Sequence, residues 1–183
     1  MIGRYSLFVA EKARQLLQKD PVFLDTETTG LDSRAEIVEI SIVDYEGNIL
    51  LDELVKPSRK IPYDVTQIHG ITDDDVRDAK PWLFVWPKVQ EVLSNKVVGI
   101  YNAEFDLRMM KQSHQIYRMP WNNPASEMFC LMNMYSEFIR TTRWQPLYRA
   151  GQRCGIPLQN THRALDDTLL ALEVFRYMVQ YRG

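Results

Sequence analysis

The chain has little of what secreted, membrane-spanning or redox-active proteins usually contain. It has only two cysteines, Cys130 and Cys154, which are far apart and match no metal or redox spacing, so we expect reduced thiols in a core. No apolar run approaches the ~20 residues that cross a bilayer. Residues 1–20 mix charged with apolar side chains and lack a signal-peptide core. We therefore expect a cytoplasmic protein with no membrane partner.

An excess of basic charge, which proteins that coat nucleic acid usually carry, is also absent. The formal net charge is −2, so contact with nucleic acid should be local and brief or assisted by metal ions. Arginines gather in the last third of the chain, which a solvated surface explains as well as a binding track does. With 183 residues, 45% apolar and 25% charged, residues 1–183 are expected to form a single domain with a sizeable core.

The sequence does contain an unusual pair of acids inside an apolar segment. Asp25 and Glu27 lie two residues apart in a stretch with the pattern of a buried strand, so their side chains point to the same face. Carboxylates crowded in this way repel each other and lose hydration, which a folded protein tolerates when a cation or a shared proton compensates. Two solvated acids at a strand end are the plainer alternative, and the pair alone does not exclude it.

The hydrophobic pattern predicts strands first and then strands mixed with helices. The predicted strands span residues 23–27, 37–44, 49–56 and 96–101, the first three as an antiparallel meander. The predicted helices span residues 5–18, 84–93, 105–117, 126–139, 146–154 and 164–181. Thr72, followed by three aspartates, indicates the start of one further helix. Pro87 should limit the helix predicted over residues 84–93 to a start near the proline. The order favours an α/β fold with a mixed central sheet flanked by helices.

Two further acids occupy positions that suit a functional site. Asp106 opens a helix directly after a strand, where α/β sheets place ligands, although an interaction with the helix N-terminus explains it equally well. In the last helix, a rotation of ~100° per residue turns Asp167 toward the interior and Asp166 toward solvent. A lone buried carboxylate would be costly or take up a proton, so Asp167 needs a cation, which it could share with the strand pair.

His162 lies in the loop that enters this last helix. An imidazole can accept a proton near neutral pH, although a lone loop histidine usually has no special role. Four carboxylates and a histidine suit the hydrolysis of a phosphodiester with two divalent ions, Mg²⁺ or Mn²⁺. Zinc fits less well, because the cysteine and histidine ligands that it prefers are missing.

Three segments resemble the exonuclease motifs of the DEDDh family, which includes the proofreading subunits of bacterial DNA polymerases, ribonuclease T and oligoribonuclease. They are Phe23-Leu24-Asp25-Thr26-Glu27-Thr28-Thr29-Gly30-Leu31, Asn102-Ala103-Glu104-Phe105-Asp106 and His162-Arg163-Ala164-Leu165-Asp166-Asp167. Ile68-His69-Gly70-Ile71-Thr72 is similar to a further segment of the proofreading branch. The resemblance extends from about residue 22 to the C-terminus.

This resemblance implies a ribonuclease H-like fold and stepwise 3′-to-5′ release of nucleoside 5′-monophosphates from single-stranded ends, of DNA rather than RNA. The implied metal-site acids are Asp25, Glu27, Asp106 and Asp167, with Asp25 bridging both ions, and His162 is the implied general base. The implied substrate-binding residues are Thr28, Thr29, Gly30, Leu31, His69, Asn102 and Phe105. Besides single-stranded nucleic acid, a polymerase or a second copy of the chain is a candidate partner.

The sequence also departs from the family pattern at three places. Tyr101 stands where the family often has a histidine, residues 127–134 match the usual middle helix poorly, and the helix within residues 1–20 lies outside the shared pattern. None of these departures removes a catalytic residue. They bear instead on which branch of the family the chain resembles, and hence on its substrate. The alternatives are a short-RNA exonuclease and a non-catalytic member that binds nucleic acid or a polymerase. The intact acids argue against the latter.

Overall fold

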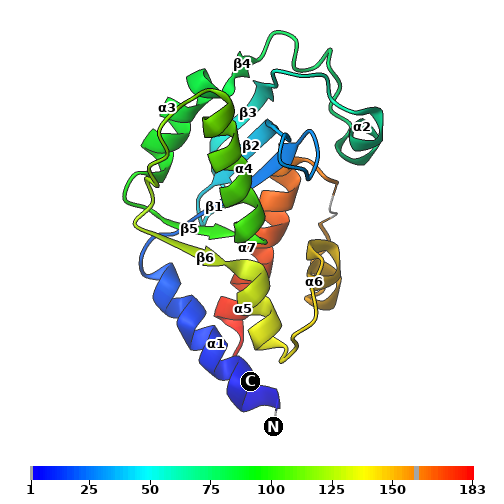
Figure 1. The fold of residues 1–183 in the computed structure, drawn as a ribbon. Helices are drawn as coiled ribbons and strands as arrows, with labels where there is room; N and C mark the ends of the chain where they lie inside the picture. The colour runs from blue at the N-terminus through cyan, green and yellow to red at the C-terminus, as the bar shows by residue number, and fades with distance from the viewer. Residues whose placement is uncertain (1, 159–160) are drawn as a thin grey trace.

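The computed structural model describes residues 2–158 and 161–183, in which one mixed sheet is flanked by helices (Figure 1). The strands are β1 (Val22–Thr28), β2 (Ile37–Val43), β3 (Ile49–Lys56), β4 (Lys80–Pro81), β5 (Val97–Ile100) and β6 (Glu127–Cys130). The helices are α1 (Ile2–Leu17), α2 (Tyr63–His69), α3 (Trp82–Leu93), α4 (Ala103–Ile116), α5 (Leu131–Phe138), α6 (Leu147–Arg153) and α7 (Ala164–Gln180).

Strand β1 lies inside the sheet, whose order is β4-β3-β2-β1-β5-β6. On one side β2 and β3 continue from it as an antiparallel meander, and on the other side β5 and β6 add in parallel. The predicted combination of a meander with parallel strands is therefore confirmed. Because β1 and β5 run in the same direction, their carboxyl ends share one edge, and the acid pair and the start of α4 lie there.

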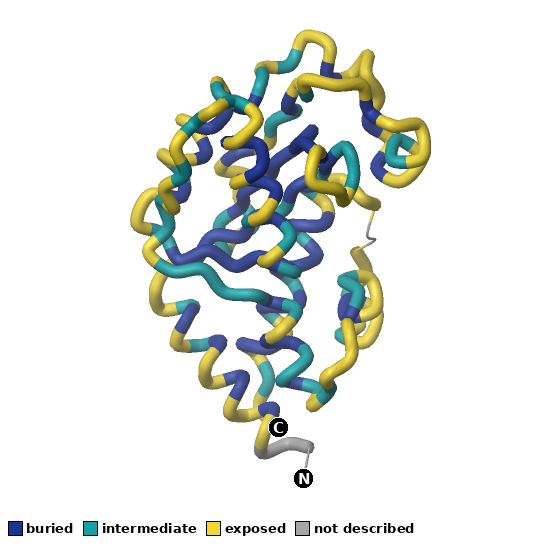
Figure 2. The backbone as a smooth tube through the Cα atoms, in the orientation of Figure 1, coloured by how far each residue is buried: buried dark blue, intermediate teal, exposed yellow. Residues whose placement is uncertain are grey.

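Side-chain alternation along β1 separates two layers of core. Phe23 points to the face covered by α1, α5 and α7, whereas Val22 and Leu24 point to the face covered by α3 and α4. Figure 2 shows the inner strands as buried backbone between more exposed helices. The same alternation directs Asp25 and Glu27 toward α7.

Helix α7 docks on β1 through aromatic side chains. The Phe175 ring centroid lies 5.2 Å from that of Phe23 and 5.7 Å from that of Phe129 on β6. Gly99 on β5 makes this packing feasible, because a Cβ there would lie 2.7 Å from the Phe129 ring and 2.9 Å from the Phe23 ring. These contacts fix the long axis of α7 against the strand that carries the acid pair.

Helix α1 packs beside α7 and adds Val9 and Ala13 to the same core. Its Arg14 Nη1 donates hydrogen bonds to the carbonyl oxygens of Val179 at 3.1 Å and Tyr181 at 3.3 Å, at the C-terminal end of α7. The helix predicted over residues 5–18 is thus present, and it begins earlier. Among the described residues, no helix has the length and apolarity needed to span a membrane.

The predicted helix over residues 126–139 is wrong in its first part. Residues 127–130 form β6, which pairs in parallel with β5 from Val97↔Glu127 to Ile100↔Cys130, and only then does α5 begin. Pairing with β5 is a long-range contact that outweighs the local helical pattern. This segment is also the one that matched the family's middle helix poorly.

Further differences concern residues 63–93, where the two-residue strand β4 was not predicted. The helix α2 was not predicted, and it ends at His69 with Gly70 as a left-handed cap at φ 76°. Thr72 does not start a helix: it exchanges hydrogen bonds with Asp75 within a series of turns, and Asp73 Oδ1 accepts a hydrogen bond from Ile61 N. Helix α3 starts at Trp82 and contains Pro87, which lies on its exposed side, where water can satisfy the freed carbonyl.

Candidate active site

Asp106 is fastened directly to the strand that carries the acid pair. It lies in the first turn of α4, which follows β5 through Asn102 in the left-handed conformation, at φ 66°. One carboxylate oxygen, Oδ1, accepts hydrogen bonds from Thr26 N at 3.1 Å and Thr26 Oγ1 at 2.7 Å. Thr26 is the residue between Asp25 and Glu27, so all three acids are held close to one another.

Asp167 reaches the same place from α7. As helical spacing predicts, Asp167 is buried and Asp166 is exposed. Just before the helix, His162 is exposed and has a left-handed backbone, φ 55°, which is uncommon for a residue other than glycine. The potential ligand atoms of Glu27, His162 and Asp167 all lie within 4.8 Å of one another. Residues from β1, α4, α7 and one loop therefore converge.

Burial and crowding raise the pKa of three carboxyl groups in the site. Burial, followed by repulsion from Asp106, Glu27 and Asp167, raises the pKa of Asp25 well above its usual range. Burial and repulsion from Asp167 raise the pKa of Glu27 to about 9. Burial also raises the pKa of Asp106 to about 7, against the hydrogen bonds from Thr26. A compensating cation would let Asp25, Glu27 and Asp106 ionise, and a cluster of hard oxygen donors fits a divalent ion.

The acids line a cavity of about 450 Å³ with most of the predicted substrate-binding residues. These are Thr28, Gly30, Leu31, His69, Asn102 and Phe105. Leu31 is 74% exposed, and its carbonyl oxygen accepts a hydrogen bond from Arg108 Nη1 at 3.1 Å. Thr29 is the exception, because it is absent from the lining and its Oγ1 accepts a hydrogen bond from Glu36 N at 2.9 Å.

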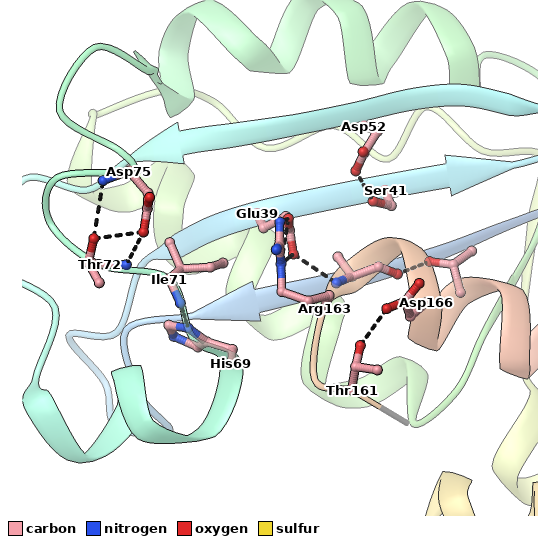
Figure 3. A network of polar contacts seen from close by, with 12 residues as sticks. Glu39, Ser41, Asp52, His69, Ile71, Thr72, Asp75, Thr161, Arg163 and Asp166 are labelled. Carbon is pink, nitrogen blue, oxygen red and sulfur yellow. Dashed lines mark hydrogen bonds and ion pairs between the residues drawn. The ribbon is translucent and has the colours of Figure 1, made fainter. Parts of the chain in front are cut away.

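His69, which ends α2, is buried on the wall of this cavity. Its Nδ1 accepts a hydrogen bond from Ile71 N at 2.9 Å (Figure 3), so the proton of the neutral ring lies on Nε2. Burial lowers the pKa of His69, which favours this neutral form. His69 is therefore built as a hydrogen-bond donor beside the acids. His114, by contrast, is buried among tryptophans.

Sequence reasoning missed Glu39, a buried acid that organises this site. Glu39 lies on β2 directly across from Glu27, and its carboxylate accepts hydrogen bonds from the Arg163 guanidinium and from Ala164 N at 2.8 Å (Figure 3). On the other side of His162, Thr161 Oγ1 donates to Asp166 Oδ2 at 2.6 Å. The loop is thus fixed on both sides of its strained histidine. The sequence did contain a signal for Glu39, because it is an acidic residue inside an otherwise apolar strand.

The fold and the site together define an α/β nuclease of the ribonuclease H-like fold. A family model described as exonuclease (RNase_T) matches residues 22–175. The chain belongs to this exonuclease family, and its recognition as a DEDDh member and as a 3′-5′ exonuclease is confirmed. Helix α1 lies outside the matched residues.

Two curated relatives show the extent of the similarity. The chain is 35% identical over 179 residues to an exonuclease, CP81, of Escherichia phage 186, and the match covers 91% of both chains. It is 30% identical over 164 residues to the PolC-type DNA polymerase III of Thermotoga maritima. That match covers 87% of this chain but only 12% of the polymerase, so the chain corresponds to a small part of that enzyme.

Solved structures share the same fold. Exonuclease X in complex with 5′-overhanging duplex DNA is 28% identical, with a TM-score of 0.62 and coverage of 84% of this chain and 89% of that one. A 3′-exonuclease that recognises the 3′ end of a histone mRNA stem-loop has a TM-score of 0.77 at 17% identity. Coverage there is 92% of this chain and 70% of that chain, and the likeness shows the fold.

Replacing Glu39 should slow the enzyme while leaving the four clustered acids in place. In Glu39→Gln the charge-assisted contacts with Arg163 are lost, so the loop that presents His162 is fixed on one side only. We expect kcat to fall by about tenfold or more, because small displacements of catalytic groups are costly, with much less change in KM. Steady-state kinetics on an oligonucleotide measures both. Glu53→Gln, which breaks the ion pair between Glu53 on β3 and Lys88 on α3, is the matched control, and equal losses in the two variants would contradict a positioning role.

The raised pKa values predict an unusual dependence of stability on pH. Without metal, the folded state holds protons on Glu27 and its neighbours that the unfolded chain releases above pH ~4.5. Their contribution is therefore complete at low pH and is lost as the pH rises toward about 9. We expect the Tm of the metal-free protein to fall between pH 5 and 9 by calorimetry.

Added Mn²⁺ should raise the Tm most at the alkaline end, because metal binding requires the deprotonated acids. In the metal-free protein, Glu27→Gln should make the Tm depend less steeply on pH. Glu91→Gln, an exposed change on α3, should leave this dependence unchanged. A Tm that rises steadily with pH in chelator would refute the electrostatic account.

Proposed function

We propose that the protein removes nucleoside 5′-monophosphates one at a time from single-stranded 3′ ends, using two divalent ions and a histidine base. The observation that carries this proposal is the convergence of Asp25, Glu27, Asp106 and Asp167 from three elements on one cavity, with His162 beside them. A non-catalytic binding protein would have no reason to crowd acids whose pKa values are raised in this way.

In this proposal the four acids would hold Mg²⁺ or Mn²⁺, with Asp25 as a ligand common to both ions. Such ions would lower the pKa of the attacking water and stabilise the charge that develops on the leaving oxygen. Asp106 keeps Oδ1 engaged by Thr26, so it offers Oδ2 or acts through water. The other acids come from β1 and α7, which the aromatic packing holds against each other.

His162 takes the proton from the attacking water. It is exposed, it lies within reach of Glu27 and Asp167, and its backbone is fixed on both sides by the contacts of Thr161 and Arg163. Leu31 and Phe105 offer apolar surface for the terminal base, and His69 offers its ring N–H. This arrangement positions the last phosphodiester of a chain end near the acids.

DNA is the favoured substrate because, among the relatives and solved structures whose descriptions name a nucleic acid, those of higher identity act on or bind DNA. These are the PolC-type DNA polymerases III at 28–30% identity and Exonuclease X, with its DNA complex, at 28%. The neighbour that recognises an RNA end is only 17% identical and supports the alternative of an RNA exonuclease. The PolC relatives also favour a polymerase over a second copy of the chain as the protein partner.

Digestion of matched substrates tests this function. We expect 5′-labelled single-stranded DNA to give a ladder shortening from the 3′ end with Mg²⁺ or Mn²⁺, to stay intact with chelator, and to be cut faster than RNA of the same sequence. Asp25→Asn should reduce the rate by several orders of magnitude, because one acid of the cluster is lost. Cleavage that persists in Asp25→Asn or in chelator would sink the proposal, and faster cutting of RNA would reverse the substrate assignment.

The role of His162 has its own test. His162→Asn should lower kcat by about 10²- to 10⁴-fold, the usual contribution of a general base, while Mn²⁺ affinity by calorimetry stays close to that of the wild type. Asp166→Asn, an exposed neighbour that contacts Thr161, controls for disturbance of the loop. If Mn²⁺ affinity collapsed together with the rate, His162 would be a metal ligand instead.

A further inference from the structure

An exposed tryptophan lies in the same cavity as the acids. Trp144 is 62% exposed and lines the cavity together with Tyr148, which is 42% exposed. The other three tryptophans pack around His114, where two of them are buried. Large aromatic surface left open to water beside a reactive centre is typical of a contact with a ligand.

Buried polar contacts hold the loop that presents Trp144. Tyr101, at the end of β5, is buried and donates its hydroxyl to the carbonyl oxygen of Gln145 at 2.8 Å. The buried Gln145 side chain donates from Nε2 to the carbonyl oxygens of Arg143 at 2.9 Å and Trp144 at 3.1 Å. Arg153 Nη1 donates to Gln145 Oε1 at 2.9 Å. The loop thus turns its polar groups inward while the indole stays outside.

The surroundings of this loop are positively charged. Residues 140–153 contain four arginines and neither aspartate nor glutamate. Arg149 lies against Tyr148: its Nε donates to the phenol oxygen at 2.8 Å, and its guanidinium carbon is 5.6 Å from the ring centroid. Aromatic faces beside arginines are the combination with which proteins bind unpaired nucleotides, the rings stacking on bases and the cations attracting phosphates.

We propose that Trp144 and Tyr148 form a stacking platform for one base of the single-stranded substrate, other than the base held at Leu31 and His69. Tyr101 and Gln145 are positioning residues that hold this platform in place. The inference rests on the proposed exonuclease function and extends it to a second nucleotide. Figure 1 shows α2 and α6 on the two sides of the segment that enters α7, so the cavity is lined from both directions.

This arrangement also explains Tyr101, which departs from the histidine common in the family. A phenol at this position reaches the loop and fixes its backbone. Because every base has a π-face, the platform should accept any sequence. It should disfavour duplex ends, whose bases are already stacked in pairs.

A comparison of two substrates separates the platform from the chemistry. One is a single-stranded DNA oligonucleotide, and the other is thymidine 5′-(p-nitrophenyl phosphate), which has no second base. The quantity compared is the ratio of kcat/KM for the oligonucleotide to kcat/KM for the aryl ester. In Trp144→Ala this ratio should fall by about 5- to 150-fold. Trp144→Phe should recover most of this ratio, and Tyr101→Phe should lower it less than Trp144→Ala. Phe84→Ala, an exposed aromatic change on α3 outside the cavity, is the control.

Abasic substitution then tests whether a base is the ligand. Oligonucleotides with an abasic site at each of the three 3′-terminal positions are compared in the wild type and in Trp144→Ala. At one position the wild-type KM should rise by about tenfold, and this penalty should disappear in Trp144→Ala. If the abasic sites raised the KM equally in both proteins at all three positions, the proposal of a stacking platform would be overturned. Loss of metal-dependent cleavage of both substrates in the wild type would instead refute the proposed function, and the platform with it.

Discussion

Mutual repulsion among carboxylates is the constraint on which the rest of this structure depends. Asp106, Glu27 and Asp167 all raise the pKa of Asp25, and Asp167 and Asp106 raise that of Glu27, so the chain must hold these acids together against their own charges. It does so by placing them on elements that are fixed elsewhere. Strand β1 is paired on both sides, α4 is tied to β1 through Thr26, and α7 is packed onto β1 by aromatic rings.

Glu39 is a buried carboxylate whose compensating partners come from the protein itself. It lies beside Glu27 in the sheet and is more deeply buried than Glu27, but it has Arg163 and a backbone N–H as partners. Its charge is thus satisfied within the protein and used for structure. The four acids of the cavity are arranged differently: all of them line the same space, and ligand atoms of Glu27 and Asp167 lie within 4.8 Å of each other. A buried acid with an arginine and a buried acid facing other acids therefore have different roles in one site.

Much of this arrangement was accessible from the sequence. Alternation along β1 and helical spacing along α7 correctly placed Asp25 and Glu27 on one face and Asp167 inside, because both are local periodicities. Strand β6 was missed because its pairing with β5 depends on a contact between distant segments. Helix α2 was missed because it is short and largely exposed, so its pattern of apolar residues is weak. Trp144 gave no signal, since exposure cannot be read from a residue's type.

The loop of residues 143–146 is held by atoms that do not depend on the side chain it displays. The anchors are the backbone oxygens of the loop, the buried amide of Gln145, and groups from β5 and α6. The residue at position 144 can therefore change during evolution without disturbing the acids, which are fastened through other elements. Selection on what the enzyme prefers to digest can in this way act separately from selection on how fast it hydrolyses a bond. Relatives that differ at this one position could serve different cellular tasks with the same chemistry.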